Sequence, residues 1–381
     1  MCVPTETPRC TGESQCGNGA LDHCAVVDAV SGCTVAEVPE ACDGDLLAFS
    51  CADVGPYEGV PRCASECFAE LESCNACATN QAIGRCAVLP TLDVGVASAG
   101  SLTAVLLDAG KLVLLDETFA VIAEPADEVL AVTDATSGFL VIVRTSDGIG
   151  SRRLFPDGMM SPVIPIAAIT DPFHVVVVAR GPDDRFLVAW MGISTRGAIL
   201  DVDGNVVVPT FSPPLVYGSM LALVGTPTRF LLATNNKQLV PISSAGASDA
   251  VVALPEASDI RAAWSGTRGW FVGLTAVPVD ANGSIVGPAV SIPEGARMRG
   301  GVAAIGDDLI VVSTNLTFSL GSSGAETVRA HDNELVRITR AGTTSEPMSI
   351  GASSGWRANL ARSGSDVLVG WSTRLARVTP P

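Results

Sequence analysis

Seven short apolar segments recur at similar spacing along the last three-quarters of this chain. Each begins with an aromatic or aliphatic residue, and their first residues are Leu102, Phe139, Phe186, Phe230, Trp270, Leu309 and Val367. Seven repeats within residues 87–381 give a period of about 42 residues, which is typical of the four-stranded blades of a β-propeller. The chain is therefore predicted to be all-β, with a seven-bladed propeller over residues 87–381.

A two-residue turn follows five of these segments, one turn in each of these five repeats. Each ends in glycine, which readily adopts the positive φ of tight hairpin turns; the turns are Asp157-Gly158, Asp203-Gly204, Ala245-Gly246, Asn282-Gly283 and Ala341-Gly342. In the third repeat, the four strands are predicted at 174–179, 185–190, 196–201 and 205–209. The four valines at 175–178 do not alternate with polar residues, which indicates a sheet that is buried on both faces.

The last repeat has only three strands before the chain reaches Pro381. A strand at 88–92, which precedes the first full repeat, is predicted to complete the seventh blade and close the ring, because closure removes exposed strand edges. The longest interval, between Leu309 and Val367, leaves six or eight blades as alternatives. We favour an insertion in the sixth blade, because the Gly- and Ser-rich residues 319–324 indicate a loop between its second and third strands.

All twelve cysteines lie in the first 86 residues, which predicts a separate disulfide-stabilised segment at 1–86. A four-cysteine zinc site at Cys63, Cys67, Cys74 and Cys77 is the alternative, but only one C-x-x-C pair is present. Disulfides require an oxidising compartment. The predicted disulfide cysteines are Cys2, Cys10, Cys16, Cys24, Cys33, Cys42, Cys51, Cys63, Cys67, Cys74, Cys77 and Cys86. Their pairing does not follow from the sequence.

Two stretches of the first segment resemble a known type of repeat. The stretches are C-G-N-G at 16–19 and E-A-C-D-G-D-L at 40–46, followed by Cys51, Gly59, Cys63, Cys67 and Cys74. They resemble the cysteine-rich repeats of secreted proteins and lipoproteins of myxobacteria and their relatives. The segments at 186–190 and 367–371 resemble the degenerate propeller repeats often joined to such segments. The resemblance implies a bacterial protein at the outer cell surface or outside the cell, and it implies no activity.

The start of the chain, Met1-Cys2, lacks the charged and apolar stretch of a secretory signal. We expect that the signal was removed or that the start is truncated. Cys2 is then a candidate for the lipid-bearing first residue of a mature lipoprotein. The alternative is an ordinary disulfide cysteine, because lipidation would leave an odd number of eleven cysteines.

Composition excludes several classes of protein. The hydrophobic fraction of 48% is ample for a packed core, and the net charge of −17 disfavours nucleic acid as a partner. The most apolar stretch, 102–115, contains Asp108 and Lys111, so no transmembrane segment is predicted.

No catalytic residue, metal site or cofactor is predicted. The three histidines are His23, His174 and His331, too few and too scattered for a histidine metal site or relay in the propeller. No G-x-S-x-G, phosphate loop or H-E-x-x-H motif occurs. Asp201 to Asn205 looks like the start of a calcium loop, but a hairpin turn explains it better. The acid pairs Asp183-Asp184 and Asp307-Asp308 are predicted to be solvated turn residues.

In a propeller, the connections from the second to the third strand and from one blade to the next emerge on one face, where binding residues gather. The candidates there are Arg144, Asp147, Trp190, Arg196, Tyr217, Asn235, Asn236, His331, Trp371 and Arg374. Trp190 and Trp371 occupy equivalent strand positions, so core packing is their alternative role. Arg196 and Arg374 both follow Ser-Thr, which is consistent with capping a strand.

These observations favour a secreted or cell-surface binding module without catalytic activity, whose ligand is an unknown protein or glycan. Two alternatives remain. One is an extracellular polysaccharide hydrolase or lyase, which needs clustered carboxylates or a metal. The other is a structural component of the cell envelope, which would lack a concave polar site.

Overall fold

The computed structural model describes residues 23–27, 34–39, 42–43, 46–47, 62–63, 69–70, 83–88, 95–107, 110–169, 175–215, 221–255, 260–273, 275–292, 301–320, 326–353, 358–371 and 374–381. Side chains are described from residue 95 onward, except at 313–320, 326–332, 351–353, 358, 371 and 374. Two compact units divide the chain. The first is Met1–Ile83, Thr314–Glu334 and Ser349–Trp356, and the second is Gly84–Ser313, Leu335–Met348 and Arg357–Pro381.

The first unit contains three two-stranded antiparallel sheets near its beginning. They are β1 (His23–Val27) with β2 (Thr34–Pro39), β3 (Cys42–Asp43) with β4 (Leu46–Leu47), and β5 (Arg62–Cys63) with β6 (Ala69–Glu70). The cysteine side chains lie outside the described residues. The six disulfides, the zinc alternative and the fate of Cys2 therefore remain predictions.

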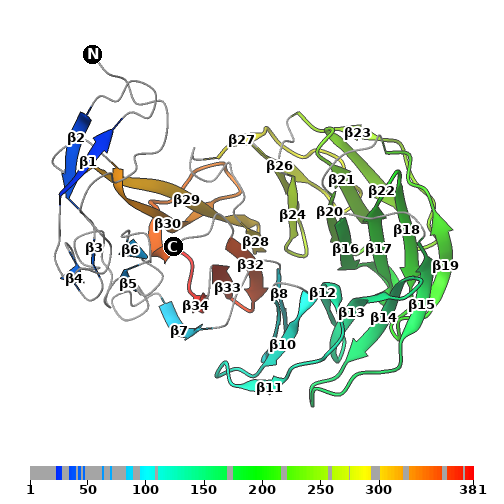
Figure 1. Ribbon diagram of the computed structural model, residues 1–381. Coiled ribbons are helices and arrows are strands. Elements are labelled where there is room, and N and C mark those ends of the chain that lie inside the picture. The colour runs from blue at the N-terminus through cyan, green and yellow to red at the C-terminus, as the bar shows by residue number, and fades with distance from the viewer. Residues whose placement is uncertain are drawn as a thin grey trace. The chain divides into compact units, whose positions relative to one another are not determined.

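Seven four-stranded antiparallel sheets are arranged as the blades of a β-propeller (Figure 1). Blade one is β8 (Gly95–Ala99), β9 (Leu102–Leu106), β10 (Leu112–Leu115) and β11 (Val121–Ala123). Blade two is β12 (Val129–Ala135), β13 (Gly138–Thr145), β14 (Gly148–Leu154) and β15 (Ile164–Ala168). Blade three is β16 (Val175–Arg180), β17 (Phe186–Met191), β18 (Thr195–Leu200) and β19 (Val206–Phe211), with the short 3-10 turn η4 (Pro182–Asp184) after β16.

The remaining blades repeat this plan from the axis outward. Blade four is β20 (Leu221–Gly225), β21 (Phe230–Thr234), β22 (Gln238–Ile242) and β23 (Val252–Ala253). Blade five is β24 (Arg261–Trp264), β25 (Gly269–Val272), β26 (Thr275–Val279) and β27 (Val290–Ser291). Blade six is β28 (Val302–Ile305), β29 (Asp308–Leu320), β30 (Glu326–Ile338) and β31 (Met348–Ser353). Blade seven is β32 (Ala358–Ser363), β33 (Asp366–Trp371), β34 (Arg374–Val378) and β7 (Ile83–Val88). We call the four positions A to D.

The ring closes in blade seven, as predicted from the three-stranded last repeat. Strand β7, from the beginning of the propeller, pairs with β34 at its end. The innermost strands contact one another in cyclic order, and β32 meets β8. The closing strand lies at Ile83–Val88 rather than at the predicted 88–92. It ends shortly before Pro90, which has no N–H to donate to a sheet ladder.

The core of the propeller lies between neighbouring blades. Each B strand presents side chains to the sheets on both sides, and all six residues of β17 are buried. For example, Leu140 and Ile142 of blade two pack with Phe186 and Trp190 of blade three. The innermost strand β16 is only half-buried over Val175–Val178, contrary to the expectation of full burial. We attribute this partial exposure to its position at the axis of the ring.

The predicted glycine turns join the C and D strands. In these turns the glycine has φ between 81° and 91°, and its N–H donates to the carbonyl oxygen three residues earlier, as from Gly204 to Asp201 at 3.1 Å. Asp201 Oδ1 also accepts hydrogen bonds from the backbone N–H of Asp203 and of Asn205. This stretch is therefore a hairpin turn, as predicted. In blade one, Phe119 takes the glycine position with φ 66°.

The insertion in blade six extends two strands. Strands β29 and β30 have 13 residues each, and β29 includes Ser319 and Leu320. The prediction of a loop beginning at Ser319 is wrong at these two residues, and 321–325 lie outside the described residues. Because β28 to β31 form one sheet, the long interval holds a single blade, and the ring has seven.

Candidate functional site

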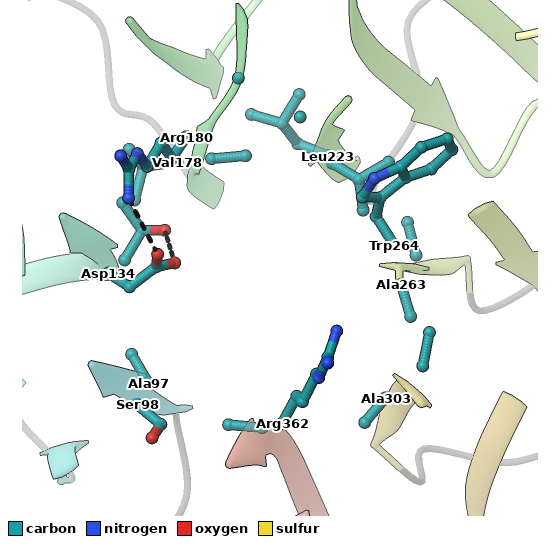
Figure 2. Close-up of a pocket in the computed structure, with 18 of the residues that line it drawn as sticks. Ala97, Ser98, Asp134, Val178, Arg180, Leu223, Ala263, Trp264, Ala303 and Arg362 are labelled. Atoms are coloured by element: carbon teal, nitrogen blue, oxygen red, sulfur yellow. Dashed lines mark hydrogen bonds and ion pairs between the residues drawn. The ribbon is translucent and has the colours of Figure 1, made fainter. Parts of the chain in front are cut away.

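A cavity of about 610 Å³ lies on the axis of the propeller (Figure 2). All seven A strands line it: β8, β12, β16, β20, β24, β28 and β32. Most of the lining residues belong to the later part of each strand, and Thr226 and Pro227 belong to the connection that follows β20. The cavity therefore lies toward the end of the propeller where A strands lead into B strands.

Small side chains keep the axis open. Ala97, Ala179, Ala263 and Ala303 come from four different blades and line the cavity with small side chains. Figure 2 shows Ala97, Ala263 and Ala303 around the central space. The largest side chains of the lining are charged or aromatic, and they give the cavity its chemical character.

Arg180 and two carboxylates form a charged network on one wall. The Arg180 Nε donates to Asp184 Oδ1 at 3.0 Å, and one of its terminal nitrogens also contacts that oxygen. Its other terminal nitrogen lies 3.7 Å from Asp134 Oδ2. The Asp134 side chain is 51% exposed, so it retains acceptor capacity toward the cavity. Asp184 of the predicted acid pair is thus an ion-pair partner rather than only a solvated turn residue.

Arg362 projects into the cavity from β32 (Figure 2). Its Nε donates to the Gly364 carbonyl oxygen at 3.1 Å. Within the described residues, its two terminal nitrogens form no hydrogen bond or ion pair. Arg362 is therefore anchored at one nitrogen and presents the planar fork of its guanidinium to the cavity.

Trp264, the last residue of β24, supplies the aromatic surface of the cavity. It is half-buried, and Figure 2 shows its indole across the central space from Asp134. Blades two, three, five and seven thus each contribute one large polar or aromatic side chain: Asp134, Arg180, Trp264 and Arg362. The cavity combines an ion-paired wall, a free guanidinium fork and an aromatic face.

The candidates chosen from the sequence lie elsewhere. Arg144 is the penultimate residue of β13 and pairs with Glu128 at 2.5 Å. Four more polar candidates, Asp147, Arg196, Asn235 and Asn236, lie in or beside connections from B to C strands. Such connections lie at the opposite end of the blades from the cavity, because neighbouring strands are antiparallel. Trp190 is 3% exposed and belongs to the core between blades two and three.

The other four candidates are only partly described. Tyr217 lies outside the described residues, and the side chains of His331, Trp371 and Arg374 are not described. Among the candidates whose side chains are described, none lines the cavity. Arg144, Asp147 and Asn235 in particular do not converge on it.

The cavity residues share a sequence position that could have identified them. Asp134, Arg180, Trp264 and Arg362 lie at or within one residue of the end of an A strand, just before the turn to strand B. Three of these turns contain glycine one or two positions later, at Gly181, Gly266 and Gly364. A charged or aromatic residue just before the turn from strand A to strand B is therefore the sequence feature that points to the cavity.

No group of three or more His, Cys, Asp or Glu side chains among the described residues is placed to hold a metal ion. Nor does that part of the chain include a helix with the length and apolar character needed to cross a bilayer.

Comparison with known proteins gives structural likenesses but no sequence relative. No protein-family model matches the chain, and no curated protein sequence matches it. Among solved structures it is similar to a protein of unknown function from Bacteroides caccae, at 15% sequence identity and a TM-score of 0.42, over 69% of this chain and 94% of that chain. The residues of the cavity are therefore the basis for its proposed chemistry.

Proposed function

We propose that this chain is a non-catalytic binding protein of the bacterial cell surface or exterior, which holds its ligand in the axial cavity. The observation that carries the proposal is the convergence of Asp134, Arg180, Trp264 and Arg362 on one cavity. Ligand sites in proteins are concave, largely apolar and furnished with a few converging polar groups, with volumes of roughly 300 to 1,000 Å³. The cavity of about 610 Å³ has a volume in this range, and charged and aromatic side chains converge on it.

The arrangement of the carboxylates supports binding rather than glycoside hydrolysis. A hydrolase places two carboxyl groups on either side of the scissile bond. The two carboxylates that line this cavity, Asp134 and Asp184, are both engaged by the one guanidinium of Arg180. They therefore share a wall. A concave site with polar walls also supports a binding protein over a purely structural component of the envelope.

The proposed location rests on the first segment. Twelve cysteines within 86 residues favour disulfides and an oxidising compartment. The resemblance of this segment to myxobacterial cysteine-rich repeats supports the outer cell surface or the exterior. Attachment through a lipid on Cys2 belongs to the same proposal.

The proposed function is tested by applying the full chain to a glycan array and then titrating the best glycan into the protein by calorimetry. We expect binding without cleavage, so the mass of the glycan stays unchanged after prolonged incubation. Trp264→Ala should weaken binding roughly tenfold or more, because tryptophan anchors typically contribute about 2 kcal/mol. Asp147→Ala, at the opposite end of the blades, is the matched control and should bind like the unaltered protein.

Three results would overturn the proposal. Shortened glycan products would make the chain a hydrolase or lyase. Loss of binding in Asp147→Ala with full binding in Trp264→Ala would move the site to the other end. Absence of binding to every glycan, together with absence of any bound protein in crosslinking at the cell surface, would favour the structural alternative.

A further inference from the structure

Resting on the proposed binding function, the charges of the cavity indicate the class of ligand. Arg180 already faces two carboxylates, so that wall carries a net charge of about −1. Arg362, on another blade, carries a positive charge that no described carboxylate neutralises. The cavity therefore has one positive point and one mildly negative wall. An anionic group of a ligand is attracted to the first and repelled by the second.

The geometry of Arg362 favours a carboxylate as that anionic group. With its Nε fixed on the Gly364 carbonyl oxygen, its terminal nitrogens point into the cavity as a planar fork (Figure 2). Such a fork matches the two oxygens of a carboxylate in a bidentate pair. A dianionic phosphate would meet more repulsion from Asp134 and Asp184, and from the net charge of −17 of the whole chain.

The rest of the cavity suits a sugar ring. The indole of Trp264 offers a flat apolar face, against which the C–H face of a sugar can pack. Across the space, the half-exposed carboxylate of Asp134 accepts hydrogen bonds from hydroxyl groups. The alanines between these groups leave room for a ring.

We propose that the cavity binds a carboxylate-bearing sugar of the uronic acid class. Arg362 pairs with the carboxylate, Trp264 packs against the ring, and Asp134 accepts hydrogen bonds from the hydroxyls. The unit is bound intact, and no bond of the ligand is made or broken.

The test compares two probes that differ in the charge of their carboxyl groups. Trigalacturonic acid and its methyl ester have the same ring and hydroxyls, but the ester lacks the carboxylate charge. Titrated into the full chain at low ionic strength, the acid should bind about tenfold or more tightly than the ester. Added salt should weaken binding of the acid and leave the ester nearly unaffected.

Two variants assign the charge effect to Arg362. Arg362→Gln should remove the preference for the acid and leave the affinity for the ester unchanged. Arg362→Lys should restore part of the preference, because lysine keeps the charge but loses the fork. Because Arg362 is exposed, neither variant should lower the melting temperature, which circular dichroism checks.

The outcomes separate this inference from the proposed function. Equal affinity for acid and ester, or a preference that survives Arg362→Gln, overturns the uronic acid inference while the binding function stands. Binding of only neutral glycans on the array does the same. Failure of every glycan and every protein partner overturns both.

Discussion

Gly225 of β20 lies directly against the backbone of Arg180 in the neighbouring blade. A Cβ built on Gly225 would stand 1.7 Å from the Arg180 carbonyl oxygen and 2.4 Å from its carbonyl carbon. Only glycine permits this approach. It sets the distance between the A strands β20 and β16 at Arg180, the residue at the centre of the charged network. The packing of the ring and the geometry of the site therefore depend on the same contact.

Gly225→Ala is expected to destabilise the propeller and to displace Arg180. Overpacking against a backbone atom costs about 1–3 kcal/mol, because the strand must shift to remove the clash. Gly95→Ala is the matched control in another A strand, since its Cβ would meet only Leu106 Cβ at 3.9 Å. Chemical denaturation measures both. Equal stabilities for the two variants would contradict the close approach.

Arg153 joins blade two to blade three. It is 5% exposed; it donates to the Ser137 carbonyl oxygen at 2.9 Å and to the Val202 carbonyl oxygen in the turn of blade three. Burial lowers the pKa of this guanidinium, and nearby Asp203 acts in the opposite direction. Burying the charged guanidinium thus costs desolvation free energy, which its hydrogen bonds offset.

Arg153→Met is expected to lower the free energy of unfolding by about 1–3 kcal/mol, because it removes the hydrogen bonds that the buried guanidinium donates to two partly buried carbonyl groups. Arg152→Met is the control on the next residue. Arg152 pairs with Asp127 near the surface, where such a pair contributes about 1 kcal/mol or less. Urea denaturation distinguishes them, and a larger loss for Arg152→Met would refute the proposed role of Arg153.

Asp307 makes the free energy of unfolding depend on pH. A hydrogen bond from the Thr267 hydroxyl is the largest cause that holds the pKa of this carboxyl below its usual range; Arg340 also contributes, and desolvation opposes them. A carboxyl with a lowered folded pKa stabilises the protein above its unfolded pKa of about 4. That contribution is lost as the pH falls through the folded pKa.

Thr267→Val should therefore reduce stability at pH 6 and make little difference well below pH 3. The measurement is chemical denaturation of both proteins across this range. Because the Asp307 side chain is only partly buried, the expected difference is small. A difference that grows as the pH falls would have the wrong sign and would exclude this hydrogen bond as its source.

The disulfide prediction for the first segment is checked by mass spectrometry. Denatured but unreduced protein treated with iodoacetamide should gain no label if all twelve cysteines form six bridges. After reduction it should gain twelve labels. Four labels without reduction, at Cys63, Cys67, Cys74 and Cys77, would instead favour a zinc site, and a lipid mass on the Cys2 peptide would identify an anchor.

Much of the fold could be predicted from sequence because the B strands carry their signal locally. Segments such as Phe186–Met191 are buried on both faces, so they are uniformly apolar and recur once per blade. The positive φ at Gly158, Gly204 and Gly283 ties the turns to one residue type. Ring closure could be predicted because the last repeat lacks one strand and an extra strand precedes the first full repeat.

The long strands of blade six escaped prediction because their signal was of another kind. Apolar residues at 316, 318 and 320 alternate with polar ones, which is the period of a strand exposed on one face. The search for uniformly apolar segments passed over this pattern and gave weight to the neighbouring glycines and serines.

The cavity escaped prediction for a geometric reason. Arg180 and Arg362 are 182 positions apart in the chain, and only the closed ring brings both to the axis. The local signal, a charged or aromatic residue near the end of an A strand, becomes a site only when the ring brings these ends together. The general preference of propellers for sites at their B to C connections led to residues at the other end of the blades.

The closed ring is the central claim, and the pairing of β7 with β34 in blade seven is the contact that closes it. Hydrogen exchange of the intact chain tests it most directly. A strand paired on both sides protects all its ladder amides, whereas an edge strand leaves alternate ones open to water. The account predicts that the amides of β34, from Arg374 to Val378, exchange as slowly as those of β18. Fast exchange at alternate β34 amides, as in the edge strand β11, would contradict it.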